Sequence, residues 1–285
     1  MSEFASFGPA GNSDSFAQLG YKSFCDIPEY VVRMGLDVFE YQCGRGVKIS
    51  AEGAAKLGQL AAQSGVTLSV HAPYYISLSG VEETKRKNSA RYLLESASAV
   101  RAMGGRRIVL HSGSAGKLER GAALELAKQT LGFCLARLDE EGYSDITLCP
   151  ETMGKLGQLG SLDEAISLCE IDDRLIPCID FGHLNARTHG GIKGVDDYAA
   201  VLDAIENRLG HERLRVFHSH FSKIEYSAGG EVRHLRFDDS VFGPDPLPLL
   251  KLVAKRGLAP TFICESDGSQ AEDAAWMKAR YFEWL

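Results

Sequence analysis

Histidines and carboxylates recur along this chain at separations of roughly one strand plus one helix. The members of the series are His71, His111, Glu151, Asp180, His218 and Glu265. Imidazole nitrogens and carboxylate oxygens are the ligands that zinc and manganese accept in proteins. A carboxylate in such a group can also move a proton. The series therefore predicts a metal site with acid–base chemistry, provided that the fold brings its members together.

The segment 176–183 shows how one pair of these side chains could be presented. An apolar, β-branched run stops at Asp180, and His183 follows three residues later. Such a run predicts a strand that ends in a tight loop, with both side chains directed beyond the strand end. An isolated Asp-x-x-His also occurs by chance in surface loops. The metal interpretation gains force because other runs end in the same way.

The elements that must position these residues alternate between two kinds. Eight runs are strand-like, and they span residues 4–8, 37–42, 67–72, 107–112, 146–151, 176–180, 214–220 and 261–266. Helical spacing of apolar residues separates them, for example over 90–97, 124–138 and 198–205, and Ser161–Glu164 has the pattern of a capping box. This alternation predicts one (β/α)8 TIM barrel over residues 1–285. A doubly wound sheet is the alternative, disfavoured because no Gly-x-Gly-x-x-Gly follows the first run.

In a barrel of this kind the carboxyl ends of all strands meet at one rim, where barrel enzymes carry their active sites. Six successive strands would deliver the six residues of the series to that rim. Converging carboxylates and imidazoles need a neutralising charge, which predicts a cluster of two or three divalent ions. Cys149, Cys178 and Cys264 precede these residues, and we expect them to turn away from the site and to serve in packing.

Composition limits the remaining possibilities. No apolar run approaches the length of a membrane span, and Met1-Ser-Glu-Phe4 does not open a signal peptide, so we expect a cytoplasmic protein without membrane contact. The seven cysteines lack close pairs, which favours reduced thiols. A formal net charge of -7 argues against a bulk electrostatic attraction to nucleic acid, although a local basic groove could override it.

Several motifs together resemble those of the endonuclease IV (type 2 apurinic/apyrimidinic endonuclease) family, within the xylose isomerase-like barrels. The motifs are His71-Ala-Pro-Tyr, His111-x-Gly-Ser, Glu151, Asp180-x-x-His183, His218-x-x-x-Ser222-Lys223 and Glu265. The resemblance implies a first metal held by His71, His111 and Glu151. It implies a second held by Glu151, Asp180, His218 and Glu265, and a third held by His183 with a further Asp and His. Zinc is the implied metal, with manganese or iron as alternatives.

The third site departs from the pattern of the family. The family has Asp-x-His after strand seven, whereas this chain has Glu231-Val-Arg-His234, which is longer by one residue. His234 is the better candidate and Glu231 the weaker one. His220 shares a strand face with His218, so it is either a ligand or a hydrogen-bonded neighbour of the ligands. His189 and His211 have no metal motif around them, and we expect both at the surface.

The resemblance also implies a reaction, the metal-dependent hydrolysis of DNA phosphodiesters at abasic sites, with Glu151 as the catalytic carboxylate. Tyr74 and Tyr75 would stack on the opened nucleotide, or would instead pack on the rim. Arg45 and Lys223 would hold phosphates, or would merely be solvated. We expect a monomer.

Other departures keep two further functions open. Glu151 is followed by Thr-Met where the family has Asn-Thr, His111 is followed by Ser where the family has Pro, and the loop after strand two differs. A sugar isomerase or epimerase on the same barrel would bind a small sugar and use Glu151 and Glu265 to move the proton. A metal-binding barrel without catalysis is the third reading.

Overall fold

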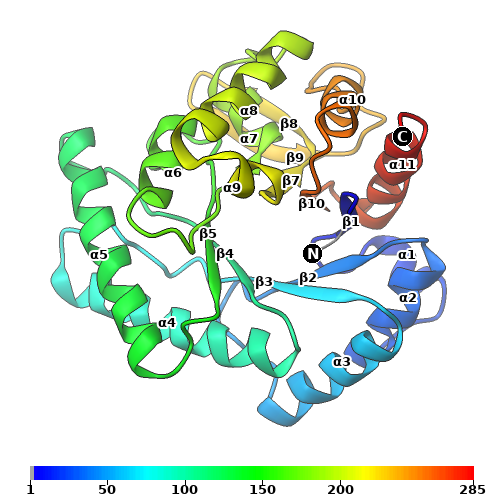
Figure 1. Cartoon of the computed structure of the whole chain (residues 1–285), viewed down its shortest axis with the longest axis horizontal. Helices are drawn as coiled ribbons and strands as arrows, with labels where there is room; N and C mark the ends of the chain where they lie inside the picture. Colours follow the sequence, from blue (N-terminus) through cyan, green and yellow to red (C-terminus); the bar gives the residue numbers. More distant parts are fainter. Residues whose placement is uncertain (1–2) are drawn as a thin grey trace.

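Eight parallel strands form a closed ring at the centre of the molecule (Figure 1). The computed structural model describes residues 3–285. The strands of the ring are β1 (Ser6–Pro9), β2 (Val38–Gln42), β3 (Thr67–His71), β4 (Arg107–Leu110), β5 (Thr147–Pro150), β6 (Cys178–Asp180), β7 (His218–Phe221) and β10 (Thr261–Cys264). They make two four-stranded sheets, β1-β10-β7-β6 and β2-β3-β4-β5. Single parallel bridges, Ala10 to Glu40 and Glu151 to Cys178, join the two sheets and complete the ring. The predicted TIM barrel is confirmed.

Helices surround this ring in the usual alternation. They are α1 (Asp14–Gln18), α2 (Ile27–Arg33), α3 (Ala51–Gln63), α4 (Glu83–Ala102), α5 (Arg120–Glu140), α6 (Leu162–Cys169), α7 (Phe181–Arg187), α8 (Val195–Leu209), α9 (His211–Arg215), α10 (Leu247–Lys255) and α11 (Gln270–Phe282), with a 3-10 turn at Phe24–Asp26. The helices predicted over 90–97, 124–138 and 198–205 lie within α4, α5 and α8. The capping box at Ser161 and Glu164 does open α6. None of the helices over residues 3–285 is long and apolar enough to cross a membrane.

Two segments differ from the predicted pattern. The seventh strand begins at His218, because Leu214 and Arg215 belong to the short helix α9. A hairpin of β8 (Lys223–Ser227) and β9 (Gly230–Leu235) follows β7 and was not expected. Ala228 and Gly229 form its turn, and the bridge between Gly230 and Lys155 connects the hairpin to the loop after β5. The hairpin therefore extends one wall of the rim.

Apolar side chains fill the space between ring and helices, and smaller groups fill the interior of the ring. One interior group consists of Val109, Cys149, Ile176 and Cys178. The expectation that Cys149 and Cys178 turn away from the site was wrong. Each lies two residues before a site carboxylate, and alternation along a strand places residues i and i+2 on the same face. Cys264 contacts Met277, with 3.5 Å between the sulfur atoms.

Candidate metal centre

The ends of the strands bring most of the predicted residues together at one mouth of the barrel. A cavity of about 450 Å³ opens there, and its lining includes His71, His111, Glu151, His183, His234 and Glu265. Asp180 and His220 are fully buried beside Glu151 and Glu265. The predicted series thus converges in space, while its role in binding metal stays a prediction.

Glu151 occupies the middle of this group and is 1% exposed. Its Oε2 lies 3.2 Å from His71 Nε2 and 3.0 Å from His111 Nε2. Its Oε1 lies 3.0 Å from His220 Nδ1 and 3.4 Å from His183 Nδ1. The two oxygens of one carboxylate therefore face two different sets of imidazoles, which is the geometry of a bridging ligand.

The first set fits a cation because of how its rings are held. His71 Nδ1 lies 2.9 Å from the carbonyl oxygen of Ala72. A carbonyl only accepts, so Nδ1 carries a proton, and in the neutral ring Nε2 turns a lone pair toward Glu151 Oε2. Two acceptors at this distance repel each other unless a proton or a metal ion lies between them. In the metal-free protein burial disfavours a charged His71, but the adjacent Glu151 outweighs burial and raises the pKa of the ring.

A second set consists of Glu151, Asp180, His220 and Glu265, whose ligand atoms lie within 4.8 Å of one another. Asp180 Oδ1 accepts the backbone N–H of His183, while the buried Oδ2 lies 3.2 Å from His183 Nδ1 but accepts no hydrogen bond in the described chain. Burial raises the pKa of Asp180 to about 6. A buried carboxylate oxygen that accepts no hydrogen bond and lies beside two further carboxylates fits a site that a divalent cation completes.

A third set consists of His183, Glu231 and His234. His183 Nδ1 lies 2.9 Å from the carbonyl oxygen of Thr152, which leaves Nε2 toward Glu231, 3.4 Å from its Oε2. His234 Nδ1 lies 2.8 Å from Ser222 Oγ, so its Nε2 is also free to bind a cation. The rings of His183 and His234 lie 5.3 Å apart between centroids.

A β-bulge explains how the stretched Glu231-Val-Arg-His234 can serve this third set. Tyr226 pairs with Glu231 and Glu225 pairs with Arg233, so Val232 is the extra residue of the hairpin. In a regular strand residues i and i+3 point to opposite faces, whereas a bulge restores a common face across the added residue. Val232 is half exposed. The bulge therefore compensates for the longer spacing.

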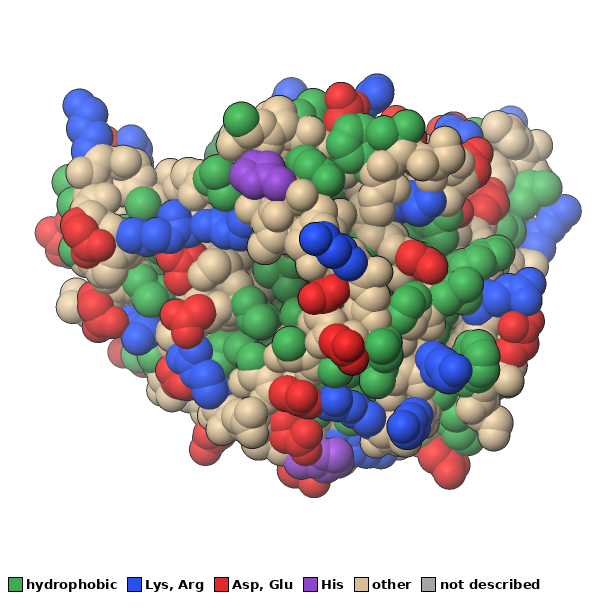
Figure 2. Space-filling model, turned by 90° about the horizontal axis from the view of Figure 1, so that it is seen from above, with side chains coloured by type: hydrophobic (Ala, Val, Ile, Leu, Met, Phe, Trp, Pro, Cys, Tyr) green, Lys and Arg blue, Asp and Glu red, His purple; other side chains and the backbone are tan. Residues whose placement is uncertain are grey.

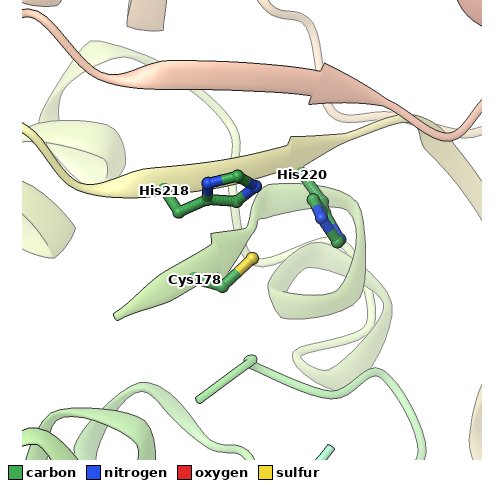
Figure 3. Close-up of side chains that lie close together, drawn as sticks. All are labelled: Cys178, His218 and His220. Carbon is green, nitrogen blue, oxygen red and sulfur yellow. The ribbon is translucent and has the colours of Figure 1, made fainter. Parts of the chain in front are cut away.

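His218 and His220 occupy different depths of the barrel. His220 pairs with Asp180 across the β6–β7 ladder, and His218 pairs with Cys178. His218 lies deeper, with Nε2 3.0 Å from Glu40 Oε2, and Figure 3 shows it with His220 on β7 beside Cys178 on the neighbouring strand β6. The second set includes His220 in the place where the motif spacing suggested His218. The spacing of the motif favours His218 as the ligand, whereas the register of β6 and β7 sets His220 level with Asp180.

Glu40 is the main residue that the sequence interpretation missed. It is fully buried on β2, and burial alone would raise its pKa, but the imidazoles of His220 and His218 hold the pKa well below its usual range. A carboxylate inside the apolar run Val38-Phe39-Glu40-Tyr41 was the available signal. Glu40 is the third of the five residues of β2, whereas the predicted ligands lie at or just beyond the ends of their strands.

The predicted substrate contacts divide into two kinds. Tyr74 lines the mouth, is 60% exposed and stacks on His111, with ring centroids 5.7 Å apart. Arg45 is exposed in the neighbouring loop, whose Gly44 carbonyl accepts the backbone N–H of Tyr74. Tyr75 instead packs on Tyr92 of α4, at 5.6 Å.

Lys223 is not brought to the mouth. Its Nζ donates to the carbonyl oxygen of Asp239. It lines a different cavity, together with Phe237 and Trp276. Gln42, Lys155 and Gln158, which the motifs did not single out, line the mouth instead.

A closed ring of eight parallel strands with imidazoles and carboxylates at one mouth defines an α/β barrel with a polar site on its rim. The chain belongs to the xylose isomerase-like TIM barrel family, whose model matches residues 28–280. It is 34% identical over 247 residues to the uncharacterized protein MJ0133 of Methanocaldococcus jannaschii, covering 86% of this chain and 88% of that one. It is 29% identical over 183 residues to a probable endonuclease 4 of Mycoplasma pneumoniae, covering 62% and 60% of the two chains.

Solved structures of two activities share the fold. Endonuclease IV of Thermus thermophilus superposes with a TM-score of 0.70 at 19% identity, covering 98% of each chain. A D-tagatose 3-epimerase-like protein superposes with a TM-score of 0.73 at 17% identity, covering 98% of this chain and 97% of that one. The resemblance to endonuclease IV that the motifs indicate is confirmed as a family relationship. The two structural neighbours do not decide between an endonuclease and an epimerase reaction for this chain.

Proposed function

We propose that this protein is a metal-dependent phosphodiester hydrolase related to endonuclease IV, which cleaves DNA at abasic sites. The observation that carries the proposal is the position of Glu151, with Oε2 toward His71 and His111 and Oε1 toward His220. A carboxylate shared between two ligand sets could help to hold two ions, which would supply the positive charge and the activated water that phosphodiester hydrolysis requires. Relatives named probable endonuclease 4 support this choice.

The residues would divide the work as follows. His71, His111 and Glu151 would hold a first ion, Asp180, His220, Glu265 and Glu151 a second, and His183, Glu231 and His234 a third. When bound, zinc ions supply a water of lowered pKa and positive charge for the phosphate; manganese or iron would suit the same ligands. Glu151 would orient the attacking water, because both of its oxygens face the ligand sets.

Tyr74 and Arg45 would contact the DNA at the rim. The Tyr74 ring already stacks on His111, and its exposed edge is available to a nucleotide opened at an abasic site. Over the face shown in Figure 2, acidic and basic side chains are interspersed, in keeping with the formal net charge of -7. Attraction to phosphate would therefore come from the bound ions and from single residues such as Arg45 and Lys155.

A sugar isomerase or epimerase is the second candidate. The loop after β5 and the β8–β9 hairpin wall the mouth, and Gln42, Lys155 and Gln158 offer hydrogen bonds of the kind that sugar hydroxyls take. The volume of about 450 Å³ suits a small ligand. Glu151 and Glu265 would then move the proton between adjacent carbons.

One paired experiment separates the candidates. Zinc-loaded protein is incubated with a duplex that carries a single abasic site, with an undamaged duplex as control, and we expect a nick that a chelator abolishes. In parallel, ketose sugars are incubated in heavy water, and deuterium incorporation at carbon is followed by NMR. Deuterium exchange without nicking would reject the hydrolase in favour of the sugar enzyme. The absence of both activities would favour a noncatalytic barrel.

A Glu151→Gln variant links the activity to the site. We expect nicking to fall by about 100-fold or more, the loss typical of removing a group that assists proton transfer. The circular dichroism spectrum should stay unchanged, because the amide keeps the shape of the side chain. Retained nicking in this variant would remove Glu151 from the proposed mechanism.

A further inference from the structure

Glu40 lies one layer below the candidate metal centre and is fully buried, as Asp180 is. Its Oε1 lies 2.9 Å from His220 Nε2 and 3.3 Å from Gln42 Nε2. Its Oε2 lies 3.0 Å from His218 Nε2 and 2.9 Å from Ser69 Oγ. Both oxygens are thus fully hydrogen-bonded, and the carboxylate contacts two histidines of β7 from the opposite side of the barrel.

These contacts decide which nitrogen of His220 is free. An ionised carboxylate only accepts hydrogen bonds, so His220 Nε2 carries a proton. In the neutral ring the lone pair must then lie on Nδ1. That nitrogen lies 3.0 Å from Glu151 Oε1 and 3.5 Å from Glu265 Oε2, on the side of the mouth.

His220 differs in this respect from His71 and His234, whose second nitrogens meet a backbone carbonyl and a serine hydroxyl. His183 Nδ1 lies 2.9 Å from the carbonyl oxygen of Thr152 and 3.2 Å from Asp180 Oδ2, but Asp180 is itself a candidate ligand of the second set and does not lie behind the ligand layer. Only a carboxylate adds a full negative charge behind the ring, which makes the imidazole a stronger metal ligand as well as fixing its orientation. A buried carboxylate is costly unless it is paired, so its place behind His220 calls for an explanation.

We propose that Glu40 is a positioning residue that holds His220 as the Nε2–H tautomer and thereby presents Nδ1 to a metal ion at the mouth. This inference rests on the metal binding in the proposed function, but it is independent of which substrate is used. His218 and Cys178, which lie beside His220 on the adjoining strands (Figure 3), then form the support below the ligand layer.

The first test reads the ring directly in the unaltered protein. Protein labelled with 15N-histidine is loaded with zinc, and the ring of His220 is assigned by the signals that disappear in a His220→Asn variant. We expect long-range proton–nitrogen spectra to show a proton on Nε2 and zinc on Nδ1. A proton on Nδ1 with zinc on Nε2 would overturn the proposal.

The second test removes the carboxylate. In a Glu40→Leu variant we expect zinc affinity, measured by competition with a chromophoric chelator, to fall by about 10- to 100-fold, the range typical for contacts behind metal ligands. Glu40→Gln keeps one acceptor oxygen, and its affinity should lie between those of Glu40→Leu and the wild type. Ser69→Ala is the matched control, because it removes a contact to Oε2 without touching His220, and it should bind zinc as the wild type does.

The outcomes are separable. Wild-type affinity in a folded Glu40→Leu protein would overturn the inference and leave the hydrolase proposal standing. If Glu40→Leu does not fold, the ring spectrum of the wild type decides. Zinc binding with the expected His220 spectrum but without nicking would reject the hydrolase alone, and a wild-type protein that binds no zinc would overturn both.

Discussion

Asp180 and His183 share the first turn of α7, where Asp180 Oδ1 accepts the backbone N–H of His183 at 2.7 Å. This contact caps the helix, since Asp180 is its N-cap residue. It uses one carboxylate oxygen and leaves Oδ2 buried without a hydrogen bond. The Asp-x-x-His spacing therefore couples the start of a helix to the second and third ligand sets.

An Asp180→Asn substitution should separate these two roles. Asparagine caps helices about as well as aspartate, so the free energy of unfolding of the metal-free protein should fall by no more than ~0.5 kcal/mol. Metal affinity should fall by more than about 100-fold, since a ligand itself is lost and not merely a contact behind one. Ser161→Ala, which removes the cap of α6 away from the mouth, should cost ~0.5–2 kcal/mol of stability and leave metal affinity unchanged. Normal metal binding by Asp180→Asn would contradict the ligand role.

His220 and His218 should respond differently to the same substitution. His220→Gln should bind one metal ion fewer than the wild type after dialysis, as measured by elemental analysis. His218→Gln should keep the wild-type stoichiometry, because His218 lies in the layer of Cys178, below the ligand set. The opposite result would favour the ligand assignment that the motif spacing suggested.

Deleting Val232 should be tolerated by the third ligand set. Without the bulged residue, Glu231 and His234 would be separated by Arg233 alone and would share a strand face by simple alternation. We expect the deletion variant to keep the metal stoichiometry of the wild type, whereas His234→Ala should lose one ion. Loss of that ion in the deletion variant would show that the bulge does more than restore the face.

Metal binding should release protons. In the metal-free protein burial opposes charge on His183, but Asp180, Glu151 and Glu231 outweigh it and raise the pKa from 6.5 to about 10. The ring is therefore protonated at pH 8, and an incoming ion must displace that proton. Affinity for the third ion should rise about tenfold per pH unit up to about pH 10.

The same shift has a defined sign for folding. A raised histidine pKa stabilises the metal-free fold fully below pH 6.5, and this contribution disappears as the pH rises through about 10.

The protons released by metal binding can be counted by calorimetric zinc titrations at pH 8 in two buffers of different ionisation enthalpy. His183→Gln should lower that count by about one, and heats independent of the buffer would contradict the prediction.

The barrel was predictable because each strand is an apolar run that ends at a polar residue, and because a closed ring of such units places those ends on one rim. The convergence of His71, Glu151 and Asp180 follows from this topology alone. Depth within the ring was not predictable, because it depends on the stagger between strands. The register sets His220 level with Asp180, while the ligand role of His218 stays a prediction. The bulge at Val232 was not predictable either. It arises because Tyr226 pairs with Glu231 and Glu225 pairs with Arg233, and no local sequence pattern indicates this pairing.

Glu40 and Glu151 lie at the two seams where the half-barrels meet, each at a single bridge between otherwise separate sheets. Glu40 reaches from one half to His218 and His220 of the other, and Glu151 joins His220 in the same way. The polar side chains at the centre thus connect the two four-stranded sheets of the barrel. A cation bound at the mouth would add a further link between the two halves, so we expect its binding to raise the free energy of unfolding of the barrel.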